Sequence, residues 1–171
     1  MSERQVYQLV VDGDSVVITG PDGALLSATA IDGVHILVRK ARTQIQRANQ
    51  LRVAHTLRWK FPAKESDCRA IHSVVYAIGP TSPTYTDALP DSLRAAWPGV
   101  IKIGYTNNSL MGRCSALSNS LGGALRVYAF AYCSNPREAE GGMHAILAPH
   151  RIYSEWFDRD HVMGYLTAGV R

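Results

Sequence analysis

The sequence predicts an α+β fold, in which short strands alternate with helices behind an N-terminal β-hairpin and a basic helix. Runs rich in β-branched and aromatic residues recur along the chain and are typical of strands. Helix-start signals follow some of these runs, as at Asn107-Asn108-Ser109. An earlier stretch, residues 34–60, has apolar residues at helical spacing, many basic residues and no acidic one.

Length and composition indicate one globular domain, or a domain of about 100 residues with an extension. The chain has 171 residues, 46% of them hydrophobic, and a formal net charge of +4. This small positive charge favours a polyanionic partner such as nucleic acid without deciding the matter. The N-terminus lacks a signal-peptide core, and no run approaches the roughly 20 apolar residues of a membrane span. The 3 cysteines fit neither a zinc site nor a disulfide framework, so we expect a cytoplasmic protein without a membrane partner.

Residues 1–66 are predicted to form an accessory region that binds nucleic acid. Residues 7–11 and 15–19 are strand-like and flank an Asp-Gly-Asp sequence, whose glycine allows the tight turn of a hairpin. Pro-Asp-Gly at residues 21–23 marks a second turn, after which residues 24–30 could form a third strand.

The basic stretch completes this region as an amphipathic helix, although residues 34–38 could instead form a strand that runs into it. A helix face with a single sign of charge attracts a polyanion without reading its sequence. We therefore expect Arg39, Arg42 and Arg47 to contact DNA phosphates. A solvated helix face explains the same pattern equally well.

A second module is predicted at residues 67–171, after a polar linker that contains Pro62. An insertion, residues 84–98, separates its first two strands and contains its shortest helix. The module's strands are expected at residues 69–78, 100–105 and 125–132, and its helices at residues 91–96, 110–117, 136 to about 149, and 158–166.

The order of several residue groups in this module resembles that of the GIY-YIG nuclease superfamily. The groups are Val74-Val75-Tyr76, Lys102-Ile103-Gly104, Arg113, Glu140 with His144, and Glu155-Trp156-Phe157. The last two groups look like the subgroup found in phage and fungal proteins. The resemblance covers residues 71–171 and implies a small three-stranded antiparallel sheet flanked by helices, with the active site on one sheet face.

The resemblance also implies an endonuclease that cleaves phosphodiester bonds in DNA with one divalent metal, Mg²⁺ or Mn²⁺. Tyr76 would be the general base, although a tyrosine with a pKa of about 10 needs a nearby cation to act at neutral pH. Arg113 would clamp a phosphate oxygen, because its guanidinium is always charged and binds bidentately. Glu140 would be the metal ligand, since Mg²⁺ prefers carboxylate oxygens. Tyr105 is expected to line the site and contact nucleic acid, and His72 is the alternative lining residue.

Three features of the predicted metal-binding helix bear on these assignments. His144 lies four residues after Glu140, so both share one helix face, and His144 is predicted to join the catalytic group. Glu138 is the rival carboxylate. Because it lies two residues before Glu140 on the helix, the two side chains face different directions and only one can join the site. Gly141-Gly142 costs about 1 kcal/mol per glycine relative to alanine, which suggests close approach by another backbone or by nucleic acid.

Lys102 and Glu155 are the two members of the pattern that allow more than one role. Lys102 stands where the second signature usually has tyrosine, and could neutralise phosphate or lower the pKa of Tyr76. Glu155 could pair with Arg113 or His144, or could simply flank the aromatic pair that follows it.

Two other interpretations remain beside the endonuclease. The module could be a catalytically weak or inactive protein that binds nucleic acid, and Lys102 bears most on this choice. Alternatively, the N-terminal hairpin and helix could be the interface of an oligomerisation protein.

Overall fold

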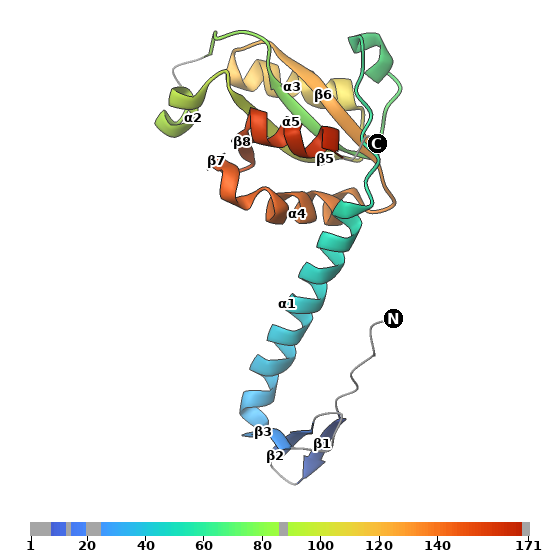
Figure 1. Ribbon diagram of the computed structural model, residues 1–171, viewed down its shortest axis with the longest axis vertical. Helices are drawn as coiled ribbons and strands as arrows, with labels where there is room; N and C mark the ends of the chain where they lie inside the picture. Colours follow the sequence, from blue (N-terminus) through green and yellow to red (C-terminus); the bar gives the residue numbers. More distant parts are fainter. Residues whose placement is uncertain (1–7, 13–14, 20–24, 86–88, 169–171) are drawn as a thin grey trace. The chain divides into compact units, whose positions relative to one another are not determined.

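In the computed structural model the chain forms two compact units, Met1–Gln46 and Arg47–Arg171 (Figure 1). The structure describes residues 8–12, 15–19, 25–85 and 89–168, with side chains from residue 42 onward. The division into units falls inside one long helix, α1 (Ile31–His55). The functional boundary expected between residues 66 and 67 stays a prediction.

The first unit contains a small antiparallel sheet of three strands in the order β1-β2-β3. The predicted hairpin is formed by β1 (Gln8–Asp12) and β2 (Ser15–Thr19), and the possible third strand is present as β3 (Leu25–Ala30). Residues 13–14 and 20–24, where both turns were predicted, lie outside the described residues. α1 follows β3 directly, so the alternative of a strand at residues 34–38 is wrong.

The second unit is built on a five-stranded antiparallel sheet in the order β6-β4-β5-β8-β7. Its three longer strands are the predicted ones, but the expected three-stranded sheet is wrong because two further strands extend it beside β5. These two strands have 3 residues each, too few to show an alternating pattern in the sequence. The strands are β4 (Val74–Pro80), β5 (Val100–Thr106), β6 (Leu125–Tyr132), β7 (Arg151–Tyr153) and β8 (Trp156–Asp158).

Helix ends in this unit follow the local signals of the sequence. Ser109 caps one helix by accepting a hydrogen bond from the Gly112 N–H at 3.2 Å, and Gly122, with φ of 63°, ends it. Asn135 caps another through the Glu138 N–H, also at 3.2 Å. The helices are α2 (Asp91–Ala96), α3 (Leu110–Leu121), α4 (Pro136–Ile146) and α5 (Arg159–Ala168). None of the helices in the described part of the chain has the length and hydrophobicity that a membrane span needs.

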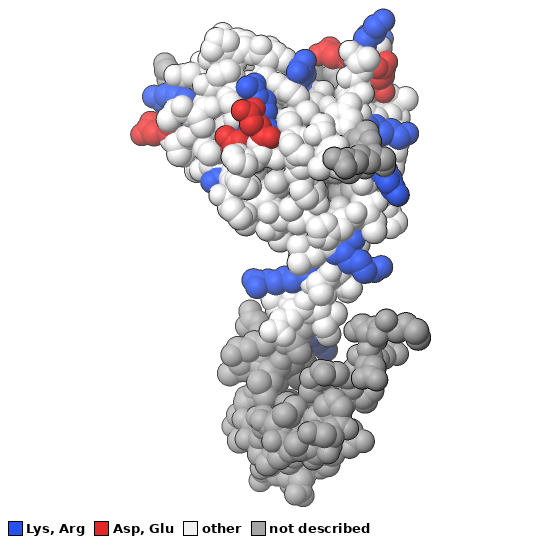
Figure 2. All heavy atoms as spheres, viewed as in Figure 1, with Lys and Arg blue, Asp and Glu red and all other residues white. Residues whose placement is uncertain are grey.

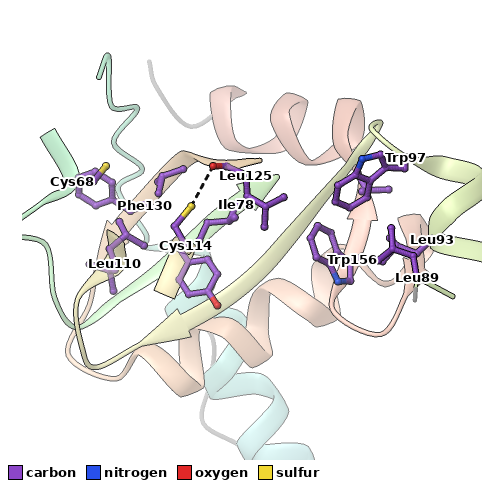
Figure 3. Packing of buried hydrophobic residues seen from close by; sticks show 14 residues of the cluster. Cys68, Ile78, Leu89, Leu93, Trp97, Leu110, Cys114, Leu125, Phe130 and Trp156 are labelled. Atoms are coloured by element: carbon purple, nitrogen blue, oxygen red, sulfur yellow. Dashed lines mark hydrogen bonds between the residues drawn. The ribbon is translucent and has the colours of Figure 1, made fainter. Parts of the chain in front are cut away.

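The sheet separates two hydrophobic layers, because successive residues of a strand point to opposite faces. Tyr76 and Ile78 of β4 join the layer covered by α3, in which Cys114 of α3 packs beside Leu125 of β6 (Figure 3). Val75 of β4 joins the opposite layer, which is covered by α4 and α5. Figure 1 shows α3 and α4 on opposite sides of the sheet.

The paired glycines of α4 make room for the end of α1. A Cβ on Gly142 would lie 2.0 Å from the carbonyl oxygen of Gln50, and one on Gly141 would lie 2.7 Å from that residue's side-chain nitrogen. Ala54, one turn later on α1, is only 2% exposed. The expected close approach to these glycines is therefore confirmed, with the α1 backbone approaching Gly142 and the Gln50 side chain approaching Gly141.

Candidate active site beside the open side of β5

The candidate site lies where β5 extends beyond its neighbour β8. On β5, only Val100, Ile101 and Lys102 pair with β8. Beyond them, the Ile103 N–H donates to the Glu155 carbonyl at 3.1 Å. In the described part of the chain, no strand pairs with the remaining outer side of β5. A cleft of about 390 Å³ opens there, lined by Tyr76, Tyr105, Thr106, Asn107, Asn108, Arg113, Glu140 and Glu155.

Tyr76 reaches this cleft by lying across a glycine. It pairs directly with Gly104 on β5, and a Cβ at Gly104 would lie 2.5 Å from the Tyr76 hydroxyl oxygen. Any side chain at position 104 would therefore collide with the ring. The glycine of the second signature is a steric requirement for placing the Tyr76 hydroxyl.

Arg113 holds that hydroxyl from α3. Its Nε–H donates to the Tyr76 oxygen at 3.1 Å, and its position near the start of α3 follows from the Ser109 cap. Burial raises the pKa of Tyr76 above its ordinary value, and the hydrogen bond and charge of Arg113 only partly offset this rise. The required cation is thus in contact with the tyrosine, but at neutral pH the hydroxyl keeps its proton.

Glu140 enters the cleft from the other side of the sheet. Burial, reinforced by the charge of Glu155, raises the pKa of Glu140 to about 7. Because α3 and α4 cover opposite faces, Arg113 and Glu140 meet around the open side of β5. The site therefore joins both faces and does not lie on one face as the resemblance implied.

Glu138 stays at the start of α4. Its carboxylate accepts a hydrogen bond from the Asn135 side-chain nitrogen at 3.1 Å, and it is not among the residues that line the cleft. The structure therefore brings Glu140, and not its rival, next to Tyr76 and Arg113.

Lys102 and Glu155 form an ion pair with each other. The Lys102 side chain is buried, with the whole residue 6% exposed, and its ammonium donates to the Glu155 carboxylate. Burial alone would raise the pKa of Glu155, but the hydrogen bond and charge of Lys102 bring it below its ordinary value. Glu155 therefore pairs with Lys102 and not with Arg113 or His144. Through this contact Lys102 reaches a cleft-lining residue without lining the cleft itself.

His144 anchors α4 to β5. Its Nε2 lies 2.9 Å from the Ile103 carbonyl oxygen, and its ring centre lies 5.3 Å from that of Phe157. Burial lowers the pKa of His144, so the neutral ring donates its Nε2 proton to that carbonyl. His144 is not among the cleft-lining residues, and its contacts hold α4, which also carries Glu140, against β5.

Four of the cleft-lining residues carried no site prediction. Thr106, Asn107 and Asn108 form the rim, where the Asn108 N–H donates to the Thr106 hydroxyl at 3.0 Å. The sequence showed these asparagines only as a helix start, since nothing local reveals that the turn borders a cleft. Glu155 was noted in the sequence, but its partner depends on β8, which the sequence did not reveal.

The predicted nucleic-acid contacts are only partly described. Tyr105 lines the cleft, while Arg42 and Arg47 are exposed on α1. The side chain of Arg39 lies outside the described residues. In Figure 2 the described part of α1 carries blue side chains and no red ones on the face shown, in keeping with the absence of Asp and Glu from residues 34–60.

The donor atoms of the cleft suit a hard cation. Within the described residues, no group of three or more His, Cys, Asp or Glu side chains gathers to hold a metal ion. Mg²⁺ needs no such cage, because it commonly binds through one or two carboxylates and keeps several waters. Glu140, Glu155, Asn107 and Asn108 all line the cleft and together provide an oxygen-rich set of this kind.

Comparison with known proteins identifies the family of this domain. The family model of the T5orf172 domain matches residues 73–164, which is more than half of the 171 residues. No match was found among curated proteins or among solved structures. The matched segment includes every cleft-lining residue, from Tyr76 to Glu155. The chain therefore belongs to the T5orf172 domain family, a domain related to the GIY-YIG nucleases.

Proposed function

We propose that this protein is a metal-dependent endonuclease that hydrolyses phosphodiester bonds in DNA. One observation carries the proposal: a tyrosine hydroxyl, an arginine and a partly desolvated glutamate line a single cleft. The nuclease relationship of the T5orf172 domain supports the same reaction class.

Arg113 binds the scissile phosphate. Its Nε is engaged by Tyr76, which leaves the terminal edge of the guanidinium to face a nonbridging oxygen in the cleft. A fixed positive charge at this point stabilises the additional negative charge that develops on the phosphate in the transition state. The bond to Tyr76 also fixes the orientation of the guanidinium before substrate arrives.

In its phenolate form, Tyr76 accepts the proton of the attacking water. The N–H of Arg113 points at its oxygen and stabilises the phenolate form, which opposes the effect of burial. Because burial outweighs the effect of Arg113, the Tyr76 hydroxyl is protonated at neutral pH, and the phenolate fraction increases as pH rises. Cleavage should therefore accelerate from neutral to alkaline pH.

Glu140 is the ligand for the divalent ion. Its pKa of about 7 reports a carboxylate that is poorly solvated and lies near a second one, and a bound cation relieves both costs. Bound there, Mg²⁺ or Mn²⁺ would supply stabilisation of the leaving oxygen. Lys102 and His144 act on this centre indirectly, through Glu155 and through the position of α4.

The spacing of Glu140 and His144, followed by Glu155-Trp156-Phe157, supports membership of the phage and fungal subgroup.

The second candidate function is a catalytically weak module that binds nucleic acid. Two observations favour it: Lys102 is buried against Glu155, and burial keeps Tyr76 protonated.

Nicking of supercoiled plasmid separates the two functions. We expect Mg²⁺-dependent nicking by the wild type, stopped by EDTA, and at least about 100-fold less by Glu140→Gln, which keeps the shape of the side chain but loses its charge. Glu138→Gln is the matched control, because its carboxylate lies outside the cleft, and it should keep its activity. Activity in Glu140→Gln together with inactivity in Glu138→Gln would reverse the assignment. No nicking by the wild type, with DNA binding retained, would favour the binding module.

A further inference from the structure

The middle of α1 exposes a large apolar side chain. Residues 42–49 are all exposed, and Ile45 is 63% exposed, more than any other large hydrophobic residue described. Isolated apolar residues on a surface are ordinary, so Ile45 is informative only if it belongs to a pattern.

Such a pattern runs along the helix. Apolar residues recur in alternating steps of three and four, which is the heptad spacing of a coiled coil. The seam they form consists of Ile31, Val34, Val38, Ala41, Ile45 and Ala48. Its first, third and fifth members occupy the a positions of the heptad and are all β-branched, as in two-stranded parallel coiled coils, while its d positions hold valine and alanine in place of leucine.

The seam does not compete with the packing of α1 against the second unit. That packing uses Gln50 and Ala54, which approach Gly142 of α4. Ala54 lies nine residues after Ile45, and at about 100° per residue this places it on the opposite side of the helix. Near its C-terminal end, α1 is thus buried on the side that carries Ala54, while Ile45 on the opposite side is exposed.

The charges of the helix agree with a parallel pair. At the positions flanking the seam, Leu37 would face Arg42 of the partner helix, and Gln44 would face its Asn49, so no like charges meet. Most of the cations occupy positions away from the seam. The next a position is Arg52, where two like charges would oppose each other, so the seam ends there.

We propose that two copies of this chain pair along this seam as a parallel coiled coil of roughly three heptads. Identical helices are self-complementary in this register, which identifies the partner as a second copy. In a parallel pair both catalytic units follow the same end of the coiled coil. If the proposed function holds, one dimer therefore carries two clefts, one for each strand of a duplex.

Measurement of mass in solution tests the pairing without any assay of activity. Full-length protein, analysed by sedimentation equilibrium from about 1 to 100 µM, should approach twice the 18.7 kDa of one chain. Ile45→Asp should weaken association at least about tenfold, since it places a charge at the centre of each seam. The matched control is Gln46→Asp, which adds the same charge at the neighbouring exposed position outside the seam and should dimerise like the wild type. Circular dichroism of both variants checks that the helix is retained.

The orientation has its own test. In a parallel pair the two copies of residue 48 face each other, so Ala48→Cys should form a disulfide-linked dimer on mild oxidation. Gln46→Cys should not, and wild type reports the background from the native cysteines. A monomer at all concentrations, a dimer unchanged by Ile45→Asp, or equal cross-linking of both cysteine variants would overturn the proposal. Because these readouts are masses, failure of the nuclease assignment would leave them unaffected.

Discussion

At the scale of single residues, the hydroxyl of Tyr76 sits between two opposing influences. Burial favours the neutral phenol, while the N–H of Arg113 at 3.1 Å favours the phenolate. Gly104 permits this arrangement because it has no side chain to displace the tyrosine ring. The chemistry of the cleft therefore depends as much on a missing Cβ as on the charged groups around it.

Arg113 should matter more for the rate than for affinity. Arg113→Ala should lower the single-turnover cleavage rate by roughly 100- to 1000-fold, because a positioned charge is lost from the transition state. DNA affinity should fall only a few-fold, since many phosphates share the binding energy and salt screens each contact. Arg113→Lys should not restore the rate, because an ammonium cannot bind both the tyrosine and the phosphate through a planar fork. Equal losses in rate and affinity would make Arg113 a binding residue only.

Glu140 should lower the stability of the metal-free protein above neutral pH. Below about pH 4.5 its carboxyl is protonated in folded and unfolded chains; as pH rises toward about 7, the unfolded chain loses this proton first. The free energy of unfolding therefore falls across that interval. At pH 8 in EDTA, Glu140→Gln should be more stable than wild type by roughly 1 kcal/mol, less than the full shift implies because the carboxylate still contacts solvent.

Urea denaturation at pH 4 and pH 8 measures this difference. Adding Mg²⁺ at pH 8 should stabilise the wild type and leave Glu140→Gln unchanged, because only a ligand bound to the folded state raises its stability. A variant less stable than wild type at pH 8 would contradict the prediction.

At the scale of secondary-structure elements, α1 and α4 are held together through glycine. Gly142→Ala would place a Cβ 2.0 Å from the Gln50 carbonyl oxygen, so one helix must move. We expect a loss of about 2 kcal/mol or more in the free energy of unfolding, measured by urea denaturation. Gly164→Ala is the matched control in α5, because a Cβ there meets nothing within 4 Å. It should be neutral or stabilising by up to about 1 kcal/mol, since alanine has the higher helix propensity.

At the scale of the whole molecule, the basic helix is expected to add nonspecific DNA contacts to those of the cleft. Replacing Arg39, Arg42 and Arg47 with Gln should flatten the dependence of log K on log salt by about 0.9 for each lost phosphate contact with duplex DNA. Arg69→Gln, an exposed cation outside the helix, is the control for net charge. An unchanged slope in the triple variant would make the helix a solvated surface.

Local signals in the sequence determined much of the second unit. The cap at Ser109 and the helix at residues 91–96 appeared where expected, because a cap and a helix propensity act over a few residues. The order of Tyr76, Arg113 and Glu140 along the chain resembles that of the GIY-YIG nucleases and so indicated a nuclease-related module. The match to the T5orf172 domain agrees with that relationship. Their roles in catalysis stay predictions.

Tertiary structure alone decided how these residues meet. β7 and β8 are too short to be recognised locally, yet the point where β8 stops leaves β5 open and creates the cleft. The pairing of Lys102 with Glu155 and the anchoring of His144 to β5 join residues 53 and 41 positions apart, respectively, which no spacing rule predicts. The same holds for the pKa of Tyr76, because burial is a property of the packed sheet and not of the neighbouring sequence. Sequence determined which groups are present, while strand pairing and desolvation determined which of them touch and in what protonation state.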